Sequence, residues 1–202
     1  MTVRIMIAED QAMVRQALVA LLGLEPDIEV VAQAATGDEA VAMVRKHRPD
    51  VAVLDIEMPG GTGIDVARQL HQDAFAGQVV IVTTFGRPGY LRAAMAAGAS
   101  GFLLKDSPAA ELAAAIRRVS KGERVVDPAL AAAALAEGDS PLTSRETDVL
   151  AAAAGHDAIN EIAAGLHLSP GTVRNHLSAA MHKLGARNRA EAVQIAQRKG
   201  WL

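Results

Sequence analysis

The sequence predicts two domains of different fold class: an α/β domain over residues 1–121 and an all-helical domain over residues 141–202, joined by a linker at 122–140. Apolar runs alternate with amphipathic stretches through the first domain, whereas only helical periodicity follows residue 141. Charge divides at the same place. Residues 1–140 carry 13 Lys and Arg against 18 Asp and Glu, a net of −5, and residues 141–202 carry 7 against 5, a net of +2. This asymmetry indicates two different tasks.

Five apolar runs in the first domain are expected to form strands buried on both faces, because four of them are nearly continuous and rich in Val and Ile. The runs are Val3–Ala8, Ile28–Ala34, Val51–Leu54, Val79–Val82 and Gly101–Leu104. Helical segments follow each run, at Gln11–Leu22, Gly37–His47, Gly63–His71, Pro88–Ala97 and Pro108–Lys121. This order predicts a doubly wound, five-stranded parallel sheet with helices on both faces.

The pattern weakens in the linker, where Pro128 can start a short helix through Leu135 and Glu137–Pro141 has the composition of a turn. Four helices are expected after it, at Ser144–Ala154, Asn160–Leu166, Pro170–Leu184 and Arg189–Lys199. Thr143 can cap the first of them, with Glu146 completing a capping box. Ser169 and Pro170 supply a cap and a first helical residue for the third.

Composition excludes several classes of protein. The chain has no cysteine, so it has neither disulfides nor thiolate metal sites, which suits a reducing compartment. No apolar run approaches the ~20 residues needed to cross a bilayer, and residues 1–7 lack the features of a signal peptide. We therefore expect a soluble cytoplasmic protein without membrane insertion. Three Phe, one Tyr and one Trp are too few to line a large pocket for a flat ligand.

Acidic residues end two of the expected strands: Glu9 and Asp10 follow the first, and Asp55 follows the third. In an open parallel sheet these ends meet at one edge, where ligands bind. Carboxylates held together raise one another's pKa unless a cation intervenes. A hard divalent ion with oxygen ligands resolves the conflict, and Mg²⁺ suits a site with few carboxylates.

Thr83 ends the fourth strand and Lys105 follows the fifth, so both should reach the same edge. Asp, Thr and Lys around a metal supply a carboxylate nucleophile, a hydroxyl donor and a cation for phosphoryl oxygens. Pro59 and Gly60 predict a tight turn that leaves the carboxylate of Asp55 accessible. Each residue alone is more often a cap, a turn or a solvated side chain. Their coincidence at one edge predicts a phosphoryl-transfer site.

These residues resemble the motifs of a CheY-like receiver domain over residues 1–120. The matching segments are Ala8-Glu9-Asp10, Leu54 to Gly60, Thr83 and Leu103 to Asp106. The resemblance implies that Asp55 accepts a phosphoryl group from a histidine kinase, and that Thr83 and Lys105 hold that group.

The same resemblance implies the metal ligands. Asp10 and Asp55 would bind Mg²⁺ directly, together with the backbone carbonyl of Glu57, and Glu9 would act through water. Phe102 occupies the position of an aromatic rotamer switch coupled to Thr83, although ordinary core packing accounts for this residue equally well.

The third helix of the second domain has the features of a recognition helix. Its apolar face comes from Val173, Leu177, Ala180, Met181 and Leu184, and no acidic residue occurs from 166 to 190. A polar face without acidic residues, after a short helix and a turn, suits the major groove of DNA. A small helical interaction domain with a polar face is the alternative.

The second domain also resembles a LuxR-type helix-turn-helix, over the whole of 141–202. The matching segments are Pro141 to Leu150, Glu161 to Ala163, Leu168 to Leu177 and Lys183 to Ala192. The family pattern makes Arg174, Asn175 and Ser178 the candidates for base contacts. The candidates for phosphate contacts are Thr172, His176, Lys183, Arg187 and Arg189. Glu161 is expected to fix helix geometry, and the helix Arg189–Lys199 is expected to form a dimer contact.

Together the two domains resemble the NarL/FixJ class of two-component response regulators, which are transcriptional regulators rather than enzymes. The resemblance implies that phosphorylation favours a homodimer that places two recognition helices on promoter DNA. Residues 81–90, Lys105 to Pro108 and the terminal Gly200-Trp201 are similar to the DesR branch, which pairs with DesK-type kinases and controls membrane-lipid fluidity.

Three alternatives remain open on the sequence. An aspartate-dependent phosphohydrolase would also use Asp, Thr and Lys, but it would carry a second Asp where this chain has Glu57. A ligand-sensing LuxR-type factor would need more aromatic residues, and a receiver that works without phosphate would not need the complete site.

Two local departures from the family pattern concern the second domain. The turn at 156–160 is one residue longer than the family pattern, and Gly165 lies within a helix, at a cost of roughly 1 kcal/mol.

Overall fold

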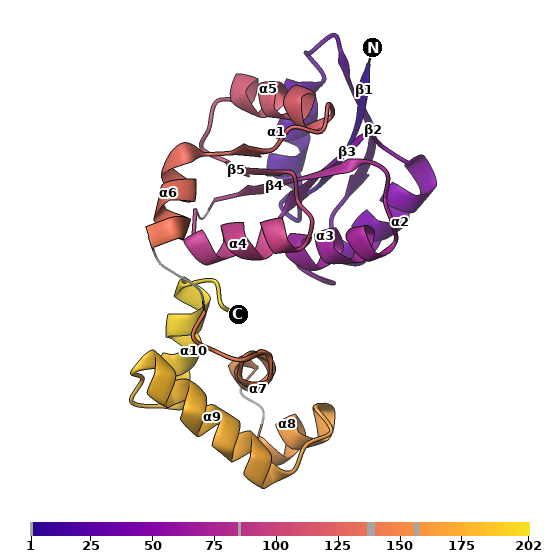
Figure 1. Ribbon diagram of the computed structural model, residues 1–202. Coiled ribbons are helices and arrows are strands. Elements are labelled where there is room, and N and C mark those ends of the chain that lie inside the picture. Colours follow the sequence, from indigo (N-terminus) through magenta and orange to yellow (C-terminus); the bar gives the residue numbers. More distant parts are fainter. Residues whose placement is uncertain (1, 85, 137–139, 156–157) are drawn as a thin grey trace. The chain divides into compact units, whose positions relative to one another are not determined.

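A computed structural model of the chain describes residues 2–84, 86–136, 140–155 and 158–202. The chain divides into two compact units, one formed by residues 1–86 and 91–132 and the other by residues 133–202 with the short segment 87–90. Figure 1 shows the α/β architecture of the first unit and the helices of the second. Both fold classes predicted from the sequence are confirmed.

The first unit contains a parallel sheet with the strand order β2-β1-β3-β4-β5-β6. The strands are β1 (Val3–Ala8), β2 (Ile28–Ala34), β3 (Val51–Asp55), β4 (Gln78–Thr83), β5 (Gly101–Leu104) and β6 (Val125–Val126). The five predicted strands are found within one residue at each end. The switch from β2 on one side of β1 to β3 on the other makes the sheet doubly wound, as expected.

The predicted number of strands was wrong, because the sheet has six. Val125 and Val126 pair in parallel with Gly101 and Phe102, and the Val125 N–H donates to the carbonyl of Ser100 at 2.9 Å. A strand of two residues is too short to show a period-2 pattern, so these residues were assigned to the linker from the sequence. The first part of that segment is therefore an edge strand of the sheet.

Helices cover both faces of the sheet, with α1 and α5 on one side and α2, α3 and α4 on the other (Figure 1). The helices of residues 1–136 are α1 (Ala12–Leu22), α2 (Gly37–His47), α3 (Gly63–Gln72), α4 (Pro88–Ala96), α5 (Ala109–Val119) and α6 (Pro128–Ala136), and the division between the units falls within α4 and α6. The side chains of Thr36 and Thr62 cap α2 and α3. The core under α1 and α5 includes alternate residues of the strands, such as Ile5, Val53 and Val80. Ile116 of α5 packs against them.

The second unit consists of α7 (Ser144–Ala154), α8 (Ile159–Gly165), α9 (Pro170–Leu184) and α10 (Arg189–Arg198). The predicted caps are present: Thr143 and Glu146 form a capping box at α7, and Ser169 caps α9 with Pro170 following it. Val173, Leu177 and Ala180 of α9 are buried against α7 and α8, and Met181 and Leu184 are partly buried beside them. The predicted apolar face of the third helix is therefore its packing face.

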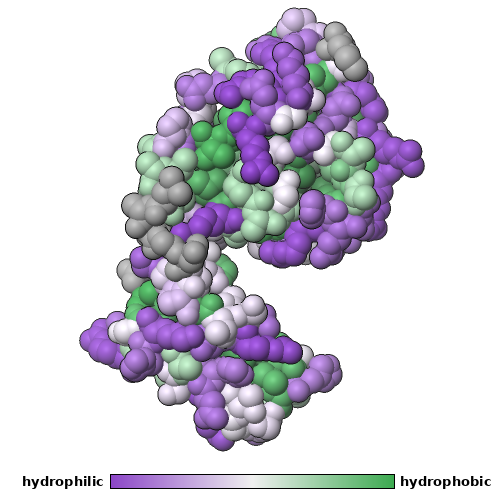
Figure 2. All heavy atoms as spheres, viewed as in Figure 1, coloured by the Kyte–Doolittle hydropathy of each residue, from purple (hydrophilic) through white to green (hydrophobic). Residues whose placement is uncertain are grey.

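Two predicted turns fall partly outside the described residues, namely 137–139 of the turn before Pro141 and 156–157 of the turn before α8. On the face shown in Figure 2, hydrophilic residues form much of the outer surface, with hydrophobic residues visible in smaller areas between them. The exposed large hydrophobic residues are Met13, Leu21 and Leu24, on α1 and just after it. Among the described residues, no helix has the length and apolar character needed to span a membrane.

Candidate functional site

The carboxyl ends of four neighbouring strands bring the predicted site residues to one rim of the sheet. Glu9 and Asp10 follow β1, and Asp55 is the last residue of β3, the strand beside β1. Asp55 is in register with Val82, so Thr83 extends one residue further along β4 on the same rim. Lys105 follows β5, and its backbone N–H donates to the carbonyl of Thr83 at 2.8 Å.

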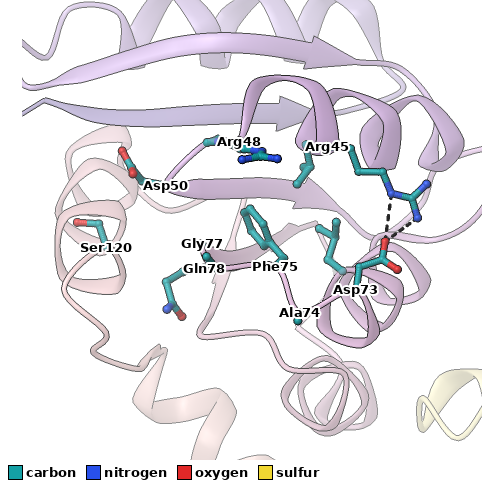
Figure 3. Close-up of a pocket in the computed structure, with 13 residues that line it drawn as sticks. Arg45, Arg48, Asp50, Asp73, Ala74, Phe75, Gly77, Gln78 and Ser120 are labelled. Carbon is teal, nitrogen blue, oxygen red and sulfur yellow. Dashed lines mark hydrogen bonds and ion pairs between the residues drawn. The ribbon is translucent and has the colours of Figure 1, made fainter.

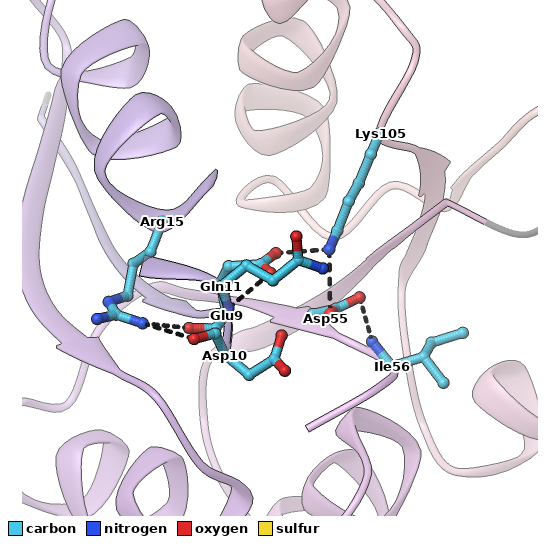
Figure 4. Close-up of polar contacts among 7 residues, drawn as sticks. All are labelled: Glu9, Asp10, Gln11, Arg15, Asp55, Ile56 and Lys105. Carbon is cyan, nitrogen blue, oxygen red and sulfur yellow. Dashed lines mark hydrogen bonds and ion pairs between the residues drawn. The ribbon is translucent and has the colours of Figure 1, made fainter. Parts of the chain in front are cut away.

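Lys105 joins the two buried carboxylates of the site (Figure 4). Its Nζ lies 2.6 Å from Oε2 of Glu9 and 3.0 Å from Oδ2 of Asp55. The exposed fraction of the side chain is 10% for Lys105, 1% for Glu9 and 5% for Asp55. The other carboxylate oxygen of Asp55 accepts the N–H of Ile56 at 2.8 Å. The predicted meeting of Lys105 and Asp55 is therefore found, although the ammonium covers much of the Asp55 carboxylate that we expected to be accessible.

The three carboxylates suit a small hard cation. Oxygens of Glu9, Asp10 and Asp55 all lie within 4.8 Å of one another, and Asp10 is exposed to solvent while the other two are buried. Three carboxylates with a single ammonium leave an excess of negative charge. The donor set is made of oxygen atoms only, which is the type that Mg²⁺ prefers.

Burial and charge set the protonation of this cluster. Burial raises the pKa of Glu9, the negative charge of Asp55 raises it further, and the hydrogen bond from Lys105 only partly opposes these effects. Burial alone would lower the pKa of Lys105, but its hydrogen bonds to Glu9 and Asp55 raise that pKa above its ordinary value. The lysine is therefore held in its charged form beside the carboxylates.

Two residues that the sequence analysis did not single out hold the acidic loop in place (Figure 4). Arg15 of α1 donates to the backbone carbonyl of Glu9 at 2.5 Å and, at 3.5 Å, to that of Asp10. The backbone N–H of Gln11 donates to Oε1 of Glu9 at 3.2 Å. An arginine five residues after an acidic pair is a weak signal, because the contact depends on where α1 begins.

Glycines shape the loop that follows Asp55. Gly60 and Gly61 have φ values of +69° and +111°, which side chains rarely adopt, so the turn predicted at Pro59-Gly60 is confirmed. Gly63 begins α3 against the end of β3: a Cβ at this position would lie 2.0 Å from the backbone carbonyl oxygen of Asp55. A side chain at position 63 would clash with the backbone of Asp55, so this close approach requires glycine.

The remaining predicted residues of the rim have different environments. Thr83 is 1% exposed and Phe102 is fully buried, in register with Ile81 and Val126 on the two adjacent strands. Glu57 is exposed. The burial of Phe102 agrees with the ordinary core role, and its part in switching stays a prediction.

A cavity of about 580 Å³ lies elsewhere in the first unit, at the amino ends of β3 and β4 (Figure 3). An ion pair between Arg45 and Asp73, at 2.6 Å, closes one side, and Phe75 is the one aromatic residue of its lining. Because strands of a parallel sheet run in the same direction, this cavity is at the opposite rim from Asp55. It is separate from the acidic cluster.

In the second unit, α9 exposes the residues predicted to contact bases. Arg174, Asn175 and Ser178 are all exposed, whereas Thr172 and His176 are half-buried. At about 100° per residue, Arg174, Asn175 and Ser178 lie within about 100° of one another around the helix axis. They therefore share the face opposite to the buried residues of α9.

Several predicted phosphate contacts have partners within the protein. Nζ of Lys183 lies 2.7 Å from Oε2 of the buried Glu146. Arg187 makes two 3.1 Å hydrogen bonds to the carboxylate of Glu191, whereas Arg189 is half-buried at the start of α10. Glu161 accepts the backbone N–H of Ala158 at 2.8 Å, at the start of α8, which agrees with its expected role in helix geometry.

Comparison with known protein families identifies both units. Residues 5–117 match the response regulator receiver domain. Residues 140–196 match the bacterial regulatory proteins of the luxR family. The two matches cover the acidic cluster and the whole of α9.

Similar proteins match the chain over almost its full length. The chain is 47% identical to the transcriptional regulatory protein DesR of Bacillus subtilis over 200 residues, 99% of each chain. It is 46% identical to the uncharacterized transcriptional regulatory protein YvfU of the same organism, over 99% of this chain and 100% of that one. The crystal structure of the response regulator ChrA of a heme-sensing two-component system aligns with a TM-score of 0.60 at 33% identity, over 100% of this chain and 99% of that one.

These relatives are named as transcriptional or response regulators, and none of the names describes an enzyme. The acidic rim, the exposed face of α9 and the two family matches therefore lead to one assignment. The chain belongs to the LuxR family of two-component response regulators, DNA-binding transcriptional regulators that combine a receiver with a helix-turn-helix domain.

Proposed function

We propose that Asp55 is the phosphoacceptor of this regulator and that its phosphorylation controls binding to promoter DNA. The observation that carries the proposal is the position of Lys105, whose ammonium lies 3.0 Å from Oδ2 of Asp55 with the Glu9 and Asp10 carboxylates on the same rim. The proposed division is a receiver at 1–121, a linker at 122–140 and a DNA-binding domain at 141–202.

The proposed reaction is a phosphoryl transfer from a histidine kinase. An oxygen of Asp55 bonds to phosphorus while the bond from phosphorus to the kinase's imidazole nitrogen breaks, and the electron pair of that bond stays on the imidazole, which takes up a proton. Lys105 and the hydroxyl of Thr83 then neutralise and hold the phosphoryl oxygens. Glu9 keeps Lys105 positioned, because the two are 2.6 Å apart.

Mg²⁺ is the proposed cofactor, and its chemistry would be neutralisation of the charge shared by the carboxylates and the phosphoryl group. Asp10, Asp55 and the backbone carbonyl of Glu57 would hold it directly, and Glu9 through water. Arg15 supports this arrangement because it holds the backbone carbonyls of the loop that carries Glu9 and Asp10.

Phosphorylation is proposed to shift a conformational equilibrium toward a homodimer, with Thr83 and Phe102 as the switch residues and α10 as a dimer contact in the DNA-binding domain. Two copies of α9 would then meet two half-sites, and the second contact would form at high effective concentration. Base contacts are assigned to Arg174, Asn175 and Ser178, and phosphate contacts to Thr172, His176, Arg187 and Arg189.

The proposed targets of this regulator are membrane-lipid genes, such as those for a desaturase, and its proposed partner is a DesK-type kinase. Similarity to DesR supports this finer proposal. Selection of fragments of the organism's own genomic DNA on the phosphorylated chain tests it. Enrichment of promoters of lipid-modifying genes would support the target, and enrichment of unrelated promoters alone would refute it.

The phosphorylation itself is tested by incubating the chain with acetyl phosphate and Mg²⁺, followed by intact mass and size-exclusion measurements. We expect a mass gain of one phosphoryl group and a shift to dimer, with tighter binding to DNA. D55N should gain no phosphate, whereas D148N, which changes an exposed aspartate of α7, should behave as the wild type. Phosphate uptake by D55N, or DNA affinity that phosphorylation leaves unchanged, would refute the proposal.

A further inference from the structure

Glu146 is the buried acidic residue of the DNA-binding domain. It is 6% exposed, and within the described residues the other buried polar or charged side chains, Glu9, Asp55 and Thr83, all belong to the phosphorylation site. Its carboxylate accepts the N–H of Thr143 at 2.7 Å and Nζ of Lys183 at 2.7 Å. One carboxylate therefore caps the first turn of α7 and binds the last turn of α9.

Helix geometry places Lys183 on the flank of the face of α9 assigned to bases. At about 100° per residue, Lys183 lies about 180° from Arg174 and about 140° from Ser178 around the helix axis, and about 80° from Asn175. It lies on the flank of α9 beside α7, the helix that is packed against α9 in Figure 1. Lys183 is an exposed residue, but its ion pair with Glu146 leaves 34% of its side chain exposed.

Removing Lys183 would leave the buried charge of Glu146 without compensation. The stem of Lys183 and the carboxylate of Glu146 therefore constrain each other, and through the capping box they constrain the register of α7 against α9. The pair spans 37 residues of sequence and links the two helices at one point. It lies near the carboxyl end of α9.

We propose that Lys183 is a positioning residue, which orients the recognition helix through its ion pair with Glu146 and does not contact a DNA phosphate. The inference concerns the same DNA-binding surface as the proposed function and rests on it. It differs from the expectation for Lys183 that the sequence supports, in which the lysine adds to the electrostatic affinity.

The two roles predict different dependence on salt and on base sequence. A phosphate contact contributes equally to every duplex, and its loss lowers the slope of log affinity against log salt by about 0.9. A positioning residue affects the contacts to bases, so its loss lowers affinity for the preferred sequence alone. Glu146 separates the roles further, because removing its charge should release Lys183 for DNA.

The test uses the full-length chain, a duplex selected from a random pool by the wild type, and a scrambled duplex of equal composition. Binding of each duplex is measured over a range of salt for the wild type, E146Q, K183M and the double variant. Glutamine keeps an oxygen for the N–H of Thr143, so E146Q retains the cap. R187Q is the matched variant that removes an exposed cation assigned to a phosphate contact.

We expect E146Q and K183M each to lose about tenfold in affinity for the selected duplex, comparable to one impaired base contact. The double variant should lose no more than either single variant, because both changes break the same interaction. Neither should change affinity for the scrambled duplex or the salt slope, whereas R187Q should lower the slope. Equal losses on both duplexes with a lower slope for K183M, or tighter binding by E146Q, would overturn the proposal.

A measurement on the wild type does not depend on the folding of any variant. Amine labelling followed by peptide mass analysis should modify Lys183 slowly, and adding the selected duplex should not slow it further. Protection of Lys183 by DNA would overturn the proposal. Failure of the wild type to select any duplex would instead overturn DNA binding itself, so the two failures are distinguishable.

Discussion

Replacing Gly63 with alanine should displace Asp55, the proposed phosphoacceptor. The new Cβ would lie 2.0 Å from the carbonyl oxygen of Asp55 and 2.9 Å from its carbonyl carbon. Contacts of a Cβ below 3.0 Å are essentially never observed, so the two backbone segments must separate by about 1 Å. The N–H of Gly63 also donates to the carbonyl of Ile56 at 3.0 Å, which limits where α3 can move.

Two energies compete in this variant. Forced overpacking in a well-packed region costs about 1–3 kcal/mol. Alanine is better than glycine in a helix by up to about 1 kcal/mol, which offsets part of that cost. A net loss of about 1–2 kcal/mol corresponds to a fall of roughly 4–8 °C in the melting temperature of the receiver. A displacement of about 1 Å of Asp55 should slow phosphate uptake by on the order of tenfold to a hundredfold.

Phosphate uptake from acetyl phosphate, followed by intact mass, and thermal unfolding of the receiver measure both effects. G165A is the control, because a Cβ on Gly165 meets nothing within 4 Å at the end of α8. That variant should gain up to about 1 kcal/mol and take up phosphate normally. G63A that melts and accepts phosphate like the wild type would refute the packing argument.

Three further predictions concern other parts of the chain. Mg²⁺ at ten times its dissociation constant should stabilise the receiver by about 1.4 kcal/mol in thermal unfolding, and D10N should lose this gain; equal stabilisation of D10N would contradict the assigned ligand. L150A removes a fully buried side chain of α7 and should destabilise the DNA-binding domain by about 2–5 kcal/mol in urea unfolding and weaken DNA binding, while phosphate uptake at Asp55 continues; loss of uptake would show that the units are not independent. The hydrogen bond from Lys183 lowers the pKa of Glu146 below its ordinary 4.5, so its stabilisation is complete above pH 4.5 and is lost as the pH falls through the lower pKa of the folded state. The stability advantage of the wild type over E146Q should therefore be constant near neutral pH and shrink below pH 4.5, and an advantage that does not change with pH would rule out the ion pair.

Local patterns predicted most of the fold because they depend on neighbouring residues alone. The capping residues Thr143 and Ser169 mark the starts of α7 and α9 in the sequence, and both caps are present. The acidic rim was also predictable, because residues at the carboxyl ends of parallel strands must share an edge of the sheet. Glu9, Asp55 and Lys105 are accordingly within direct contact.

Features that depend on long side chains or on very short elements were not predictable. Lys183 and Glu146 are 37 residues apart, and only the packing of α9 on α7 brings them to 2.7 Å. Arg15 reaches the carbonyl of Glu9 because α1 starts at Ala12, which places Arg15 in the first turn of the helix with its side chain directed back toward the loop. The close approach of Gly63 to Asp55 likewise follows from tertiary structure, since a glycine at the start of a helix is compatible with open as well as crowded surroundings.

The short strand β6 changes the reach of the connection between the domains. Residues 125–126 pair with β5, and residues 128–136 are helical, so most of the segment 122–140 has regular structure. A helix advances about 1.5 Å per residue, less than half the span of an extended chain. The described part of this segment is thus far shorter than its residue count suggests. The separations of DNA half-sites that the proposed dimer would bridge are limited accordingly, and lengthening this segment should widen the range of spacings accepted.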